Sequence, residues 1–469
     1  MAGLGELKPV VVRTALGDAH PGVRRYAIRF AERVLSDLGV SLLPLVSDGD
    51  RQVRKQLAYT LGNWRDPRAG SALGELAVGG DADPYLAAAV LSSATGANLS
   101  GIADVVLEHD RSAGLILELL RLADAVGAPD VAARLLAAVT RPQGGRYSAW
   151  QFGALAALLD ARPGRIATLR PAAAAMFPAA RAMAIDSAAT PPDRAAAVPL
   201  LGRVSDRESE DAQQLESLLG PQTPEEVQSA AVAALARIGT ADAPARLLRG
   251  WRGYGPGVRA QVLEVLSRRD GWIRAVLDAV EHKDLPAAEV NAARRQQWLR
   301  HRNPEIRARM EQLFGGAANP DRQKVIDAYA SVLTLKGDAA RGKPLFEKHC
   351  ATCHKLGDKG GEVGPDLTGL ADKPTDYLLT AILDPNRAIE PQYVAYTAEL
   401  KNGQQITGVL AAESGNRVTL IAADGKRQTV MRAELVSLES TGRSAMPEGL
   451  EKDLSAQDLA DVIAHFRHR

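Results

Sequence analysis

Two cysteines and a histidine form the most chemically distinctive segment of the sequence. The segment is Cys350-Ala351-Thr352-Cys353-His354, and it holds the only two cysteines among 469 residues. Two thiols at this spacing can each form a thioether with one vinyl group of a haem, and the adjacent histidine can then ligate the iron. The segment therefore predicts covalent attachment of one haem c, with His354 as an iron ligand.

Two other kinds of site use paired cysteines. A Cys-x-x-Cys redox pair is expected within a βαβ pattern, whereas here a polar helical segment precedes the motif and a glycine-rich loop follows it. A structural zinc site needs four ligands, and the sequence holds no second cysteine pair. Haem attachment is the interpretation that the sequence favours.

A helix is expected immediately before the motif. The periodicity predicts it over 338–349, with Asp338 as its N-terminal cap. Gly342 lies on the side where a second helix could approach closely. The positions expected to face inward are Ala340, Leu345 and Phe346.

A glycine-rich loop follows the motif and leads into Pro365. Its glycines, which allow a backbone to wrap closely around a flat ring, are Gly357, Gly360, Gly361 and Gly364. We expect Pro365 to press on the His354 imidazole, and its backbone oxygen or a neighbour's to accept the free imidazole N–H. Pro365 is therefore a candidate cofactor-binding residue.

The second axial ligand has to come from a distant part of the chain. Met446 lies in an irregular loop just before the last predicted helix, where Pro447 stiffens the backbone. Met431 lies in an alternating segment, where a methionine usually fills a core. The histidine rivals are His349, His465 and His468. Met446 is the preferred metal ligand beside His354 because of this loop position. Ligation by histidine and methionine favours reduced iron and raises the haem potential, which suits electron transfer.

The C-terminal part of the sequence resembles a known family. The motifs that carry the resemblance are Gly342, Cys350–His354, Gly364–Gly369, Ile382–Pro385, Tyr393 and Met446–Leu450. Together they resemble the haem-binding C-terminal domain of planctomycete and verrucomicrobial multidomain cytochromes, over about residues 336–469. The resemblance implies that Cys350 and Cys353 carry the haem, and that His354 and Met446 ligate its iron.

In that family the haem domain often follows helical repeats, and these often follow a β-propeller similar to sugar or sorbosone dehydrogenases. Residues 1–335 match the helical part, because they are dominated by helical patterns rich in alanine, leucine and arginine. The sequence shows no propeller, so the resemblance does not carry dehydrogenase activity to this chain.

A self-similar unit recurs within residues 1–335. Its copies are Asp18–Arg25, Asp48–Lys55, Asp81–Leu86, Thr223–Val227, Gly255–Arg259 and Arg302–Arg307. Asp or Asn before Pro makes a tight turn, and the next helix places Val23, Ala27 and Ile28 on one face. One helical pair cannot bury that face alone, so neighbours must stack. The pattern resembles HEAT-like repeats that act as a scaffold, and a non-repetitive helical bundle is the alternative.

The expected fold class is mainly α, with a HEAT-like α-solenoid over 1–335 and a cytochrome c domain over 336–469. Between about 393 and 440 the period changes to alternation, which predicts an inserted five-stranded β-barrel or sheet. The strands are expected over 393–400, 404–412, 417–422, 426–431 and 435–439. The hairpin turns are Asn402-Gly403, Gly415-Asn416 and Asp424-Gly425.

The last helix is expected over 455–467. Ser455 and Asp458 resemble a capping box at its start. Its apolar stripe, which we expect to cross the Gly342–Phe346 side of the helix over 338–349, consists of Leu459, Val462, Ile463 and Phe466.

Composition and charge exclude several classes of partner. The formal net charge of +1 gives no electrostatic case for binding nucleic acid, and no apolar run reaches membrane-spanning length. Residues 1–16 lack the basic and apolar segments of a secretory signal. Because haem c is attached outside the cytoplasm, we expect a periplasmic or other extracytoplasmic location and a chain whose signal peptide is missing.

These observations predict a monohaem module for electron transfer within a larger dehydrogenase-like protein. The expected donor is an upstream or docked dehydrogenase domain, and the expected acceptor is another cytochrome or an oxidase. An alternative is a protein-docking scaffold whose haem senses redox state or a gas. A third possibility is an enzyme acting alone, but peroxidases of this type usually need a second haem and the chain has one motif.

Overall fold

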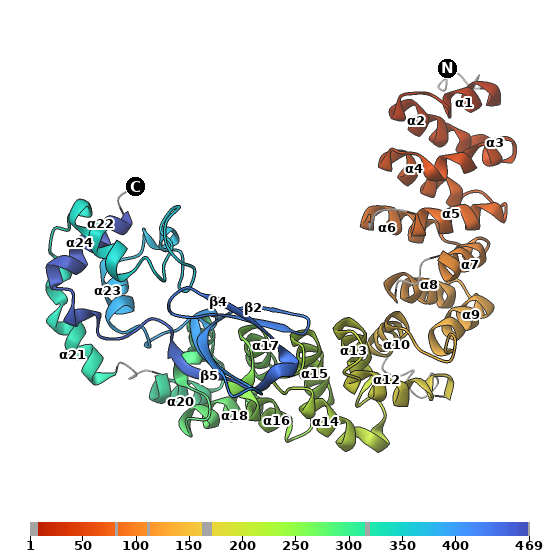
Figure 1. The fold of residues 1–469 in the computed structure, drawn as a ribbon. Coiled ribbons are helices and arrows are strands. Elements are labelled where there is room, and N and C mark those ends of the chain that lie inside the picture. The colour runs from red at the N-terminus through yellow and green to blue at the C-terminus, as the bar shows by residue number, and fades with distance from the viewer. Residues whose placement is uncertain (1–7, 80–82, 110–112, 162–170, 315–318, 468–469) are drawn as a thin grey trace. The chain divides into compact units, whose positions relative to one another are not determined.

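The computed structural model describes residues 8–79, 83–109, 113–161, 171–314 and 319–467. By its internal contacts the chain divides into two compact units, Met1–Ala182 and Met183–Arg469. The domain boundary expected between residues 335 and 336 stays a prediction. Mainly helical secondary structure is confirmed, and it accompanies one antiparallel sheet (Figure 1).

The described part of the first unit is mainly helical, and its last helix continues into the second unit. The helices are α1 (Pro9–Ala15), α2 (Pro21–Ala31), α3 (Leu35–Leu42), α4 (Arg51–Gly62), α5 (Arg68–Val78), α6 (Pro84–Ser93), α7 (Leu99–His109), α8 (Ala113–Ala125), α9 (Pro129–Thr140), α10 (Ala149–Ala161) and α12 (Met176–Ile185). Helices α2, α4 and α6 pack in succession, and α5 packs on α7. Ile28 on α2 and Leu57 on α4 are both fully buried, so each helix contributes an apolar face to this stack.

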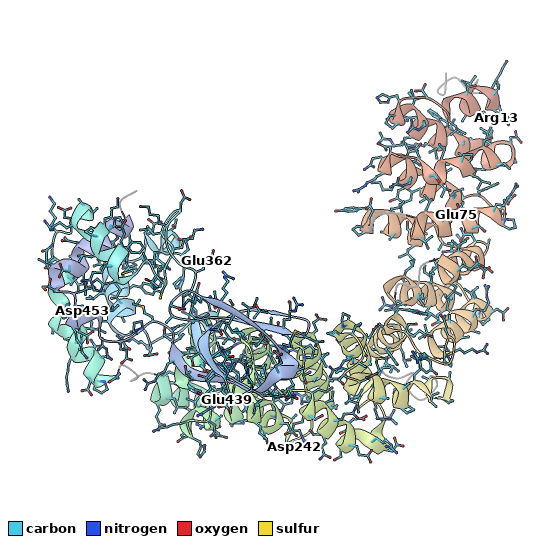
Figure 2. All side chains as sticks on the ribbon, viewed as in Figure 1. Arg13, Glu75, Asp242, Glu362, Glu439 and Asp453 are labelled. Atoms are coloured by element: carbon cyan, nitrogen blue, oxygen red, sulfur yellow. The ribbon has the colours of Figure 1, made fainter. Side chains whose placement is uncertain are left out.

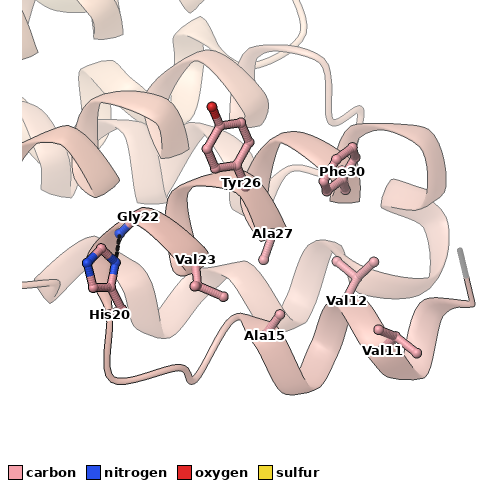
Figure 3. A pocket seen from close by; sticks show the side chains of 9 residues that line it. All are labelled: Val11, Val12, Ala15, His20, Gly22, Val23, Tyr26, Ala27 and Phe30. Carbon is pink, nitrogen blue, oxygen red and sulfur yellow. Dashed lines mark hydrogen bonds between the residues drawn. The ribbon is translucent and has the colours of Figure 1, made fainter. Parts of the chain in front are cut away.

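An apolar pocket of about 480 Å³ opens between α1 and α2 (Figure 3). Val11, Val12, Val23, Tyr26 and Phe30 contribute to its lining. Val23 was expected to face inward with Ala27 and Ile28, and that expectation is wrong because Val23 borders this pocket and is 40% exposed.

The second unit begins with helices and continues into the predicted haem domain. Its helices are α13 (Pro191–Ala197), α14 (Glu208–Ser217), α15 (Glu225–Ile238), α16 (Ala243–Arg249), α17 (Pro256–Leu266), α18 (Asp270–Glu281), α19 (Ala292–Leu299), α20 (Pro304–Phe314), α21 (Pro320–Ala328), α22 (Ala339–His349), α23 (Thr375–Leu383) and α24 (Ala456–Arg467). Helix α22 is the predicted helix over 338–349, and Asp338 accepts hydrogen bonds from Ala340 N and Arg341 N as its cap. Ala340 is exposed rather than inward-facing, so that expectation is wrong.

All five predicted strands are present within the haem domain. They are β1 (Val394–Leu400), β2 (Gln405–Ser414), β3 (Arg417–Ile421), β4 (Arg427–Met431) and β5 (Leu435–Ser444). The strands pair antiparallel in the order β4-β3-β2-β1-β5, so the sheet is open and the barrel alternative is wrong. Strand β5 lies against the short helix η7 (Trp251–Gly253), so this sheet edge packs on helices instead of closing on β4.

The buried face of the sheet meets the preceding helices through polar as well as apolar contacts. Tyr396 on β1 is fully buried, and its hydroxyl donates to the carbonyl of Tyr254 at 2.8 Å. The hydroxyl of Ser440 on β5 donates to the buried carboxylate of Glu289 at 2.7 Å. These contacts join residues that are 142 and 151 positions apart, and they attach the sheet firmly to the helices of the same unit.

Candidate haem site

The cysteine–histidine motif forms a turn that continues directly from α22. Cys350 N donates to the carbonyl of Phe346 at 2.8 Å, which extends the helical hydrogen bonding by one residue. Cys353 N and His354 N then both donate to the carbonyl of Cys350, at 3.1 and 2.9 Å. Backbone hydrogen bonds within a single turn therefore fix the main-chain positions of Cys350, Cys353 and His354 relative to one another.

The glycine-rich loop wraps back onto this turn, as its composition predicts. Gly361 N donates to the carbonyl of Ala351 and Gly364 N to that of Cys353, both at 2.8 Å. A Cβ atom added to Gly364 would lie 2.4 Å from Cε1 of His354. Only glycine at this position lets the loop run directly against the imidazole ring.

The imidazole of His354 is oriented by one backbone acceptor. Its Nδ1 lies 3.0 Å from the carbonyl oxygen of Pro365. A carbonyl only accepts, so Nδ1 carries the proton and Nε2 keeps the lone pair that a metal ion requires. Burial lowers the pKa of His354, which favours this neutral, ligating form at neutral pH.

Both cysteines are unpaired thiols that are half-buried. Burial raises the pKa of Cys350 to about 12, with a smaller contribution from Cys353, and it also raises the pKa of Cys353. A dithiol redox centre needs the opposite shift, because its attacking sulfur must be a thiolate near neutral pH. Within the described residues, no group of three or more His, Cys, Asp and Glu side chains is placed to hold a metal ion. Uncharged thiols beside an oriented imidazole fit thioether attachment of a haem.

The inserted sheet reaches the same turn from the other side. The Cys353 thiol lies 3.7 Å from the carbonyl oxygen of Ala423, in the turn between β3 and β4. Arg427 on β4 forms an ion pair with Glu362 in the glycine-rich loop, which is labelled in Figure 2. The β-insertion is thus part of the wall around the motif.

Met446 lies in the segment that joins β5 to α24. It is half-buried, and its backbone N–H donates to the Ser444 hydroxyl at 3.1 Å. The preceding residue, Ala445, packs against the small buried cluster of Val363, Val409 and Ile421. Cys353 packs against the same cluster, so the Met446 segment and the motif share a common core although they are far apart in sequence.

The rival ligands have other surroundings. Met431 is 39% exposed at the end of β4, so its expected role as core filler is wrong. His349 is the last residue of α22, and the ring centroid of His465 on α24 lies 5.6 Å from that of Phe346. His468 lies outside the described residues.

The first and last helices of the haem domain cross as expected. A Cβ atom added to Gly342 would lie 2.0 Å from the carbonyl oxygen of Asp461, so α22 and α24 are in backbone contact. Beside this crossing, the rings of Phe346 and Phe466 meet edge to face with centroids 5.9 Å apart. The apolar stripe of α24 is buried throughout: Leu459, Val462, Ile463 and Phe466.

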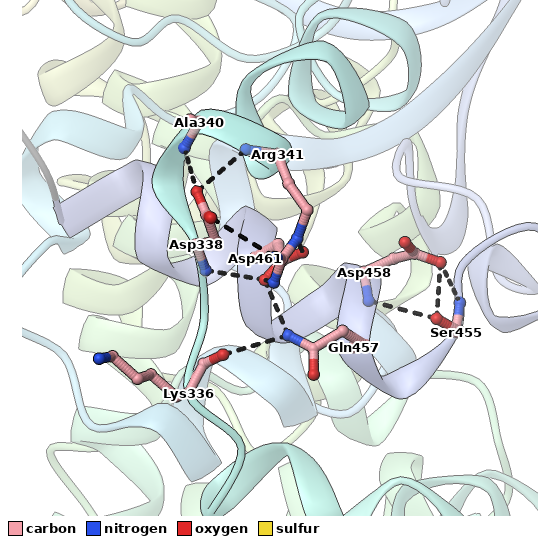
Figure 4. A network of polar contacts seen from close by, with 8 residues as sticks. All are labelled: Lys336, Asp338, Ala340, Arg341, Ser455, Gln457, Asp458 and Asp461. Atoms are coloured by element: carbon pink, nitrogen blue, oxygen red, sulfur yellow. Dashed lines mark hydrogen bonds and ion pairs between the residues drawn. The ribbon is translucent and has the colours of Figure 1, made fainter.

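A network of polar side chains also joins α22 and α24 at this crossing (Figure 4). The side chain of Asp461 is 2% exposed, and it accepts hydrogen bonds from Asp338 N at 2.7 Å and Arg341 Nε at 2.7 Å. Ser455 and Asp458 form the predicted capping box, with Ser455 N donating to the Asp458 carboxylate at 2.9 Å. Arg341 lowers the pKa of Asp461 through its hydrogen bonds.

Comparison with known proteins identifies this region. A family model described as cytochrome c matches residues 339–413. Residues 339–413 belong to a cytochrome c domain. The match includes the motif and the glycine-rich loop, and it ends before Met446.

Curated relatives match the same family. A cytochrome c-553-like protein of Synechocystis sp. is 46% identical over 48 residues, which are 10% of this chain and 45% of that protein. Cytochrome c of Arabidopsis thaliana is 43% identical over 44 residues, which are 9% of this chain and 39% of that protein. The chain therefore spans less than half the length of each of these relatives.

Among solved structures, the complex of CpcE and CpcF of phycocyanin lyase from Nostoc sp. PCC7120 is similar over 60% of this chain and 96% of the matched chain, with 17% sequence identity and a TM-score of 0.22.

The cofactor of the cytochrome c domain is haem c, bound covalently and containing iron. The residues around the motif fit it: two protonated thiols, an imidazole with Nδ1 held by Pro365, and a loop that needs glycine where it meets that ring. Within the described residues, no helix is both long and apolar enough to cross a membrane.

Some participants in the site were not apparent from the sequence. The side chain of Asn386 accepts a hydrogen bond from Ser444 N at 2.9 Å, and Ser444 lies two residues before Met446. Ala423 and Arg427 belong to the β-insertion, and their contacts with Cys353 and Glu362 were not predicted from the sequence. These residues lie in ordinary turn and strand contexts, so only their positions in three dimensions connect them to the motif.

Proposed function

We propose that residues 336–469 are a monohaem electron-transfer domain in which Cys350 and Cys353 hold the haem. His354 supplies one axial ligand and Met446 the other. The observation that carries the proposal is the orientation of His354, whose Nδ1 is engaged by Pro365 O at 3.0 Å so that Nε2 is available to iron. The bound haem supplies the one-electron Fe(III)/Fe(II) couple.

The contribution of the chain is to set the ligands and the surroundings of that couple. Pro365 keeps the imidazole in one tautomer, and burial keeps it neutral. Methionine sulfur favours reduced iron and raises the potential relative to ligation by two histidines. Support for Met446 is the packing of its neighbour Ala445 against the same cluster as Cys353.

The helical segment is proposed to be a HEAT-like scaffold over residues 1–335. In support, arginines on one helix pair bind acids on another about one repeat away. Arg274 pairs with Glu305 and Arg294 with Glu264, each at 2.7 Å and at separations of 31 and 30 residues. Such pairs recur at the spacing of the self-similar unit, as stacking of neighbouring units requires.

The proposed physiological setting is extracytoplasmic, where haem c is attached. The electron donor is proposed to be a dehydrogenase domain, either part of a longer polypeptide or docked on the helices. The acceptor is another cytochrome or an oxidase. The chemical change in the substrate takes place on the donor, and this chain carries the electron.

A redox titration of the haem-loaded chain tests the ligand assignment. Wild type should titrate as a single one-electron centre, and Met446→Ala should lower its midpoint potential because the sulfur ligand is lost. Met431→Ala is the matched control, because Met431 is a partly exposed methionine of the same domain. An unchanged potential in Met446→Ala, or an equal fall in both variants, would show that Met446 is not the ligand.

A further inference from the structure

The segment that carries Met446 is held at both ends by a single side chain. Asn386 Oδ1 accepts a hydrogen bond from Ser444 N at 2.9 Å, two residues before Met446. Asn386 Nδ2 donates to the carboxylate of Glu448, two residues after it. One amide group therefore joins the two sides of the turn that presents the thioether.

The chemistry of the amide suits this position. An asparagine side chain offers both an acceptor and a donor, and the two partners here require one of each. Ser444 N can only donate and the Glu448 carboxylate can only accept, so the orientation of the amide is fixed by its partners. Aspartate would keep the bond to Ser444 N, but it would place two carboxylates together.

Asn386 is itself anchored near a buried part of the domain. It follows Asp384 and Pro385, which are both buried, and Arg387 N donates to the carbonyl of Asp384 at 3.1 Å in the same turn. The buried guanidinium of Arg322 donates to the carbonyl of Leu383 and to Glu451. The end of α23 and the segment 444–451 are therefore linked in two ways: Asn386 bonds on both sides of Met446, and Arg322 bridges Leu383 to Glu451.

A thioether is a neutral ligand that other molecules can replace on ferric haem, so its local concentration at the iron matters. Ordering a backbone segment costs conformational entropy. A turn that is already ordered when the sulfur dissociates returns the sulfur to the iron more readily than a free loop. Asn386 supplies this order through its hydrogen bonds to Ser444 and Glu448.

We propose that Asn386 is a positioning residue that holds the Met446 turn in place and so protects the iron–sulfur bond from competing ligands. This inference rests on the proposed function, in which Met446 is the second axial ligand. Loss of the Asn386 amide frees the turn and lets the sulfur leave the iron more often. The exchange of ligand, and not the attachment of haem, is the property that changes.

Imidazole binding to the ferric, haem-loaded chain tests the inference, because imidazole must displace the sulfur to bind. Asn386→Ala should bind imidazole about tenfold more tightly than wild type, as loss of a hydrogen bond to a backbone group predicts. The weak red charge-transfer band of sulfur-ligated ferric haem should decrease in parallel. Asn402→Ala is the matched control, since it removes one asparagine bond, to Gln404 N at 2.9 Å, in the β1–β2 turn.

A paired exchange separates positioning from general damage. Asn386→Asp should bind imidazole more tightly than wild type, because its carboxylate meets Glu448. Adding Glu448→Gln restores the lost hydrogen bond between positions 386 and 448 with donor and acceptor exchanged, while Ser444 N still donates to position 386, and should return the affinity towards wild type. This pair also decides the matter if Asn386→Ala cannot be prepared with haem. Equal affinity in Asn386→Asp and the double variant would overturn the proposal.

Met446→Ala separates the assignment of Met446 as the ligand from the assignment of Asn386 as its positioning residue. If Met446→Ala and Asn386→Ala both bind imidazole more tightly, both assignments stand. If only Met446→Ala does, Met446 is the ligand and Asn386 does not position it. If Met446→Ala binds imidazole as wild type does, the proposed ligand set is wrong and the role of Asn386 falls with it.

Discussion

At the scale of single residues, the haem site depends on burial that favours uncharged groups. The pKa values of both thiols are raised and that of the His354 imidazole is lowered, in each case chiefly by burial. Neutral thiols and a neutral imidazole are the forms expected before thioethers and an iron bond are made. The same burial argues against a thiolate-based redox centre, which needs an exposed sulfur with a low pKa.

Asp461 contributes a buried, hydrogen-bonded carboxylate to the helix crossing. Its pKa is lowered by hydrogen bonds from Arg341, so its stabilising effect is complete above the ordinary aspartate pKa of about 4 and is lost as the pH falls through the lowered value. Asp461→Asn should destabilise the haem domain by about 2 kcal/mol at neutral pH. Denaturant unfolding at a series of pH values measures this difference.

The difference between wild type and Asp461→Asn should shrink below about pH 4, because wild type then also loses the charge. Asp372→Asn, which changes an exposed carboxyl of the same domain, is the control and should alter stability little. A wild-type advantage that stays constant from neutral to acidic pH would contradict the role given to the ionised carboxylate.

At the scale of elements, the close contact of α22 and α24 frames the haem domain. Gly342→Ala places a Cβ atom against the carbonyl of Asp461, where no flexible side chain can move aside. We expect a loss of about 1–3 kcal/mol in unfolding free energy, and a smaller yield of haem-loaded protein. Gly369→Ala is the control, because a Cβ atom there would meet nothing within 4 Å. Equal stability of the two variants would refute the tight crossing.

The sequence predicted the positions of helices and strands better than it predicted their contacts. The alternation of residues and the Asn402-Gly403 and Asp424-Gly425 turns located the five strands within a few residues, except that β5 extends to Ser444. The capping residues Asp338 and Ser455 located the two crossing helices. These signals are local, since a turn or a cap is set by the few residues that form it.

The sequence could not reveal how the sheet is covered. Alternation predicts that one face is buried, but the residues that bury it are contributed by helices about 150 positions earlier, as in the contacts of Tyr396 with Tyr254 and of Ser440 with Glu289. The barrel alternative was wrong because β5 packs on these distant helices instead of pairing with β4. Asn386 was also missed, because a half-buried asparagine after proline has no pattern that indicates its partners.

At the scale of the whole molecule, a buried ion pair helps to attach the sheet to the helical segment of its unit. Arg432, which follows β4, pairs with Glu413 on β2 and also donates to the carbonyl of Pro221 at 2.6 Å. Both side chains are almost fully buried, and Arg432 Nε has no hydrogen-bond partner. Replacing one partner leaves an uncompensated charge, whereas replacing both removes the problem.

Arg432→Met should therefore cost about 3–5 kcal/mol of unfolding free energy, measured by denaturant titration. The double variant Arg432→Met/Glu413→Leu should recover most of that loss, because neither charge then remains buried. Arg427→Met, which removes the more exposed ion pair with Glu362, is the comparison and should cost at most about 1 kcal/mol. Strictly additive effects of the two changes at 413 and 432 would contradict the coupling.

The central claim is that the chain carries one haem on Cys350 and Cys353, and the most direct test is the mass of the denatured polypeptide after expression with haem-attachment machinery. The account predicts that the mass increases by one haem, that the haem stays with the chain under denaturing extraction, and that neither thiol reacts with an alkylating reagent. Changing both cysteines to alanine should abolish the added mass. A colourless wild-type chain with two alkylatable thiols would contradict the account.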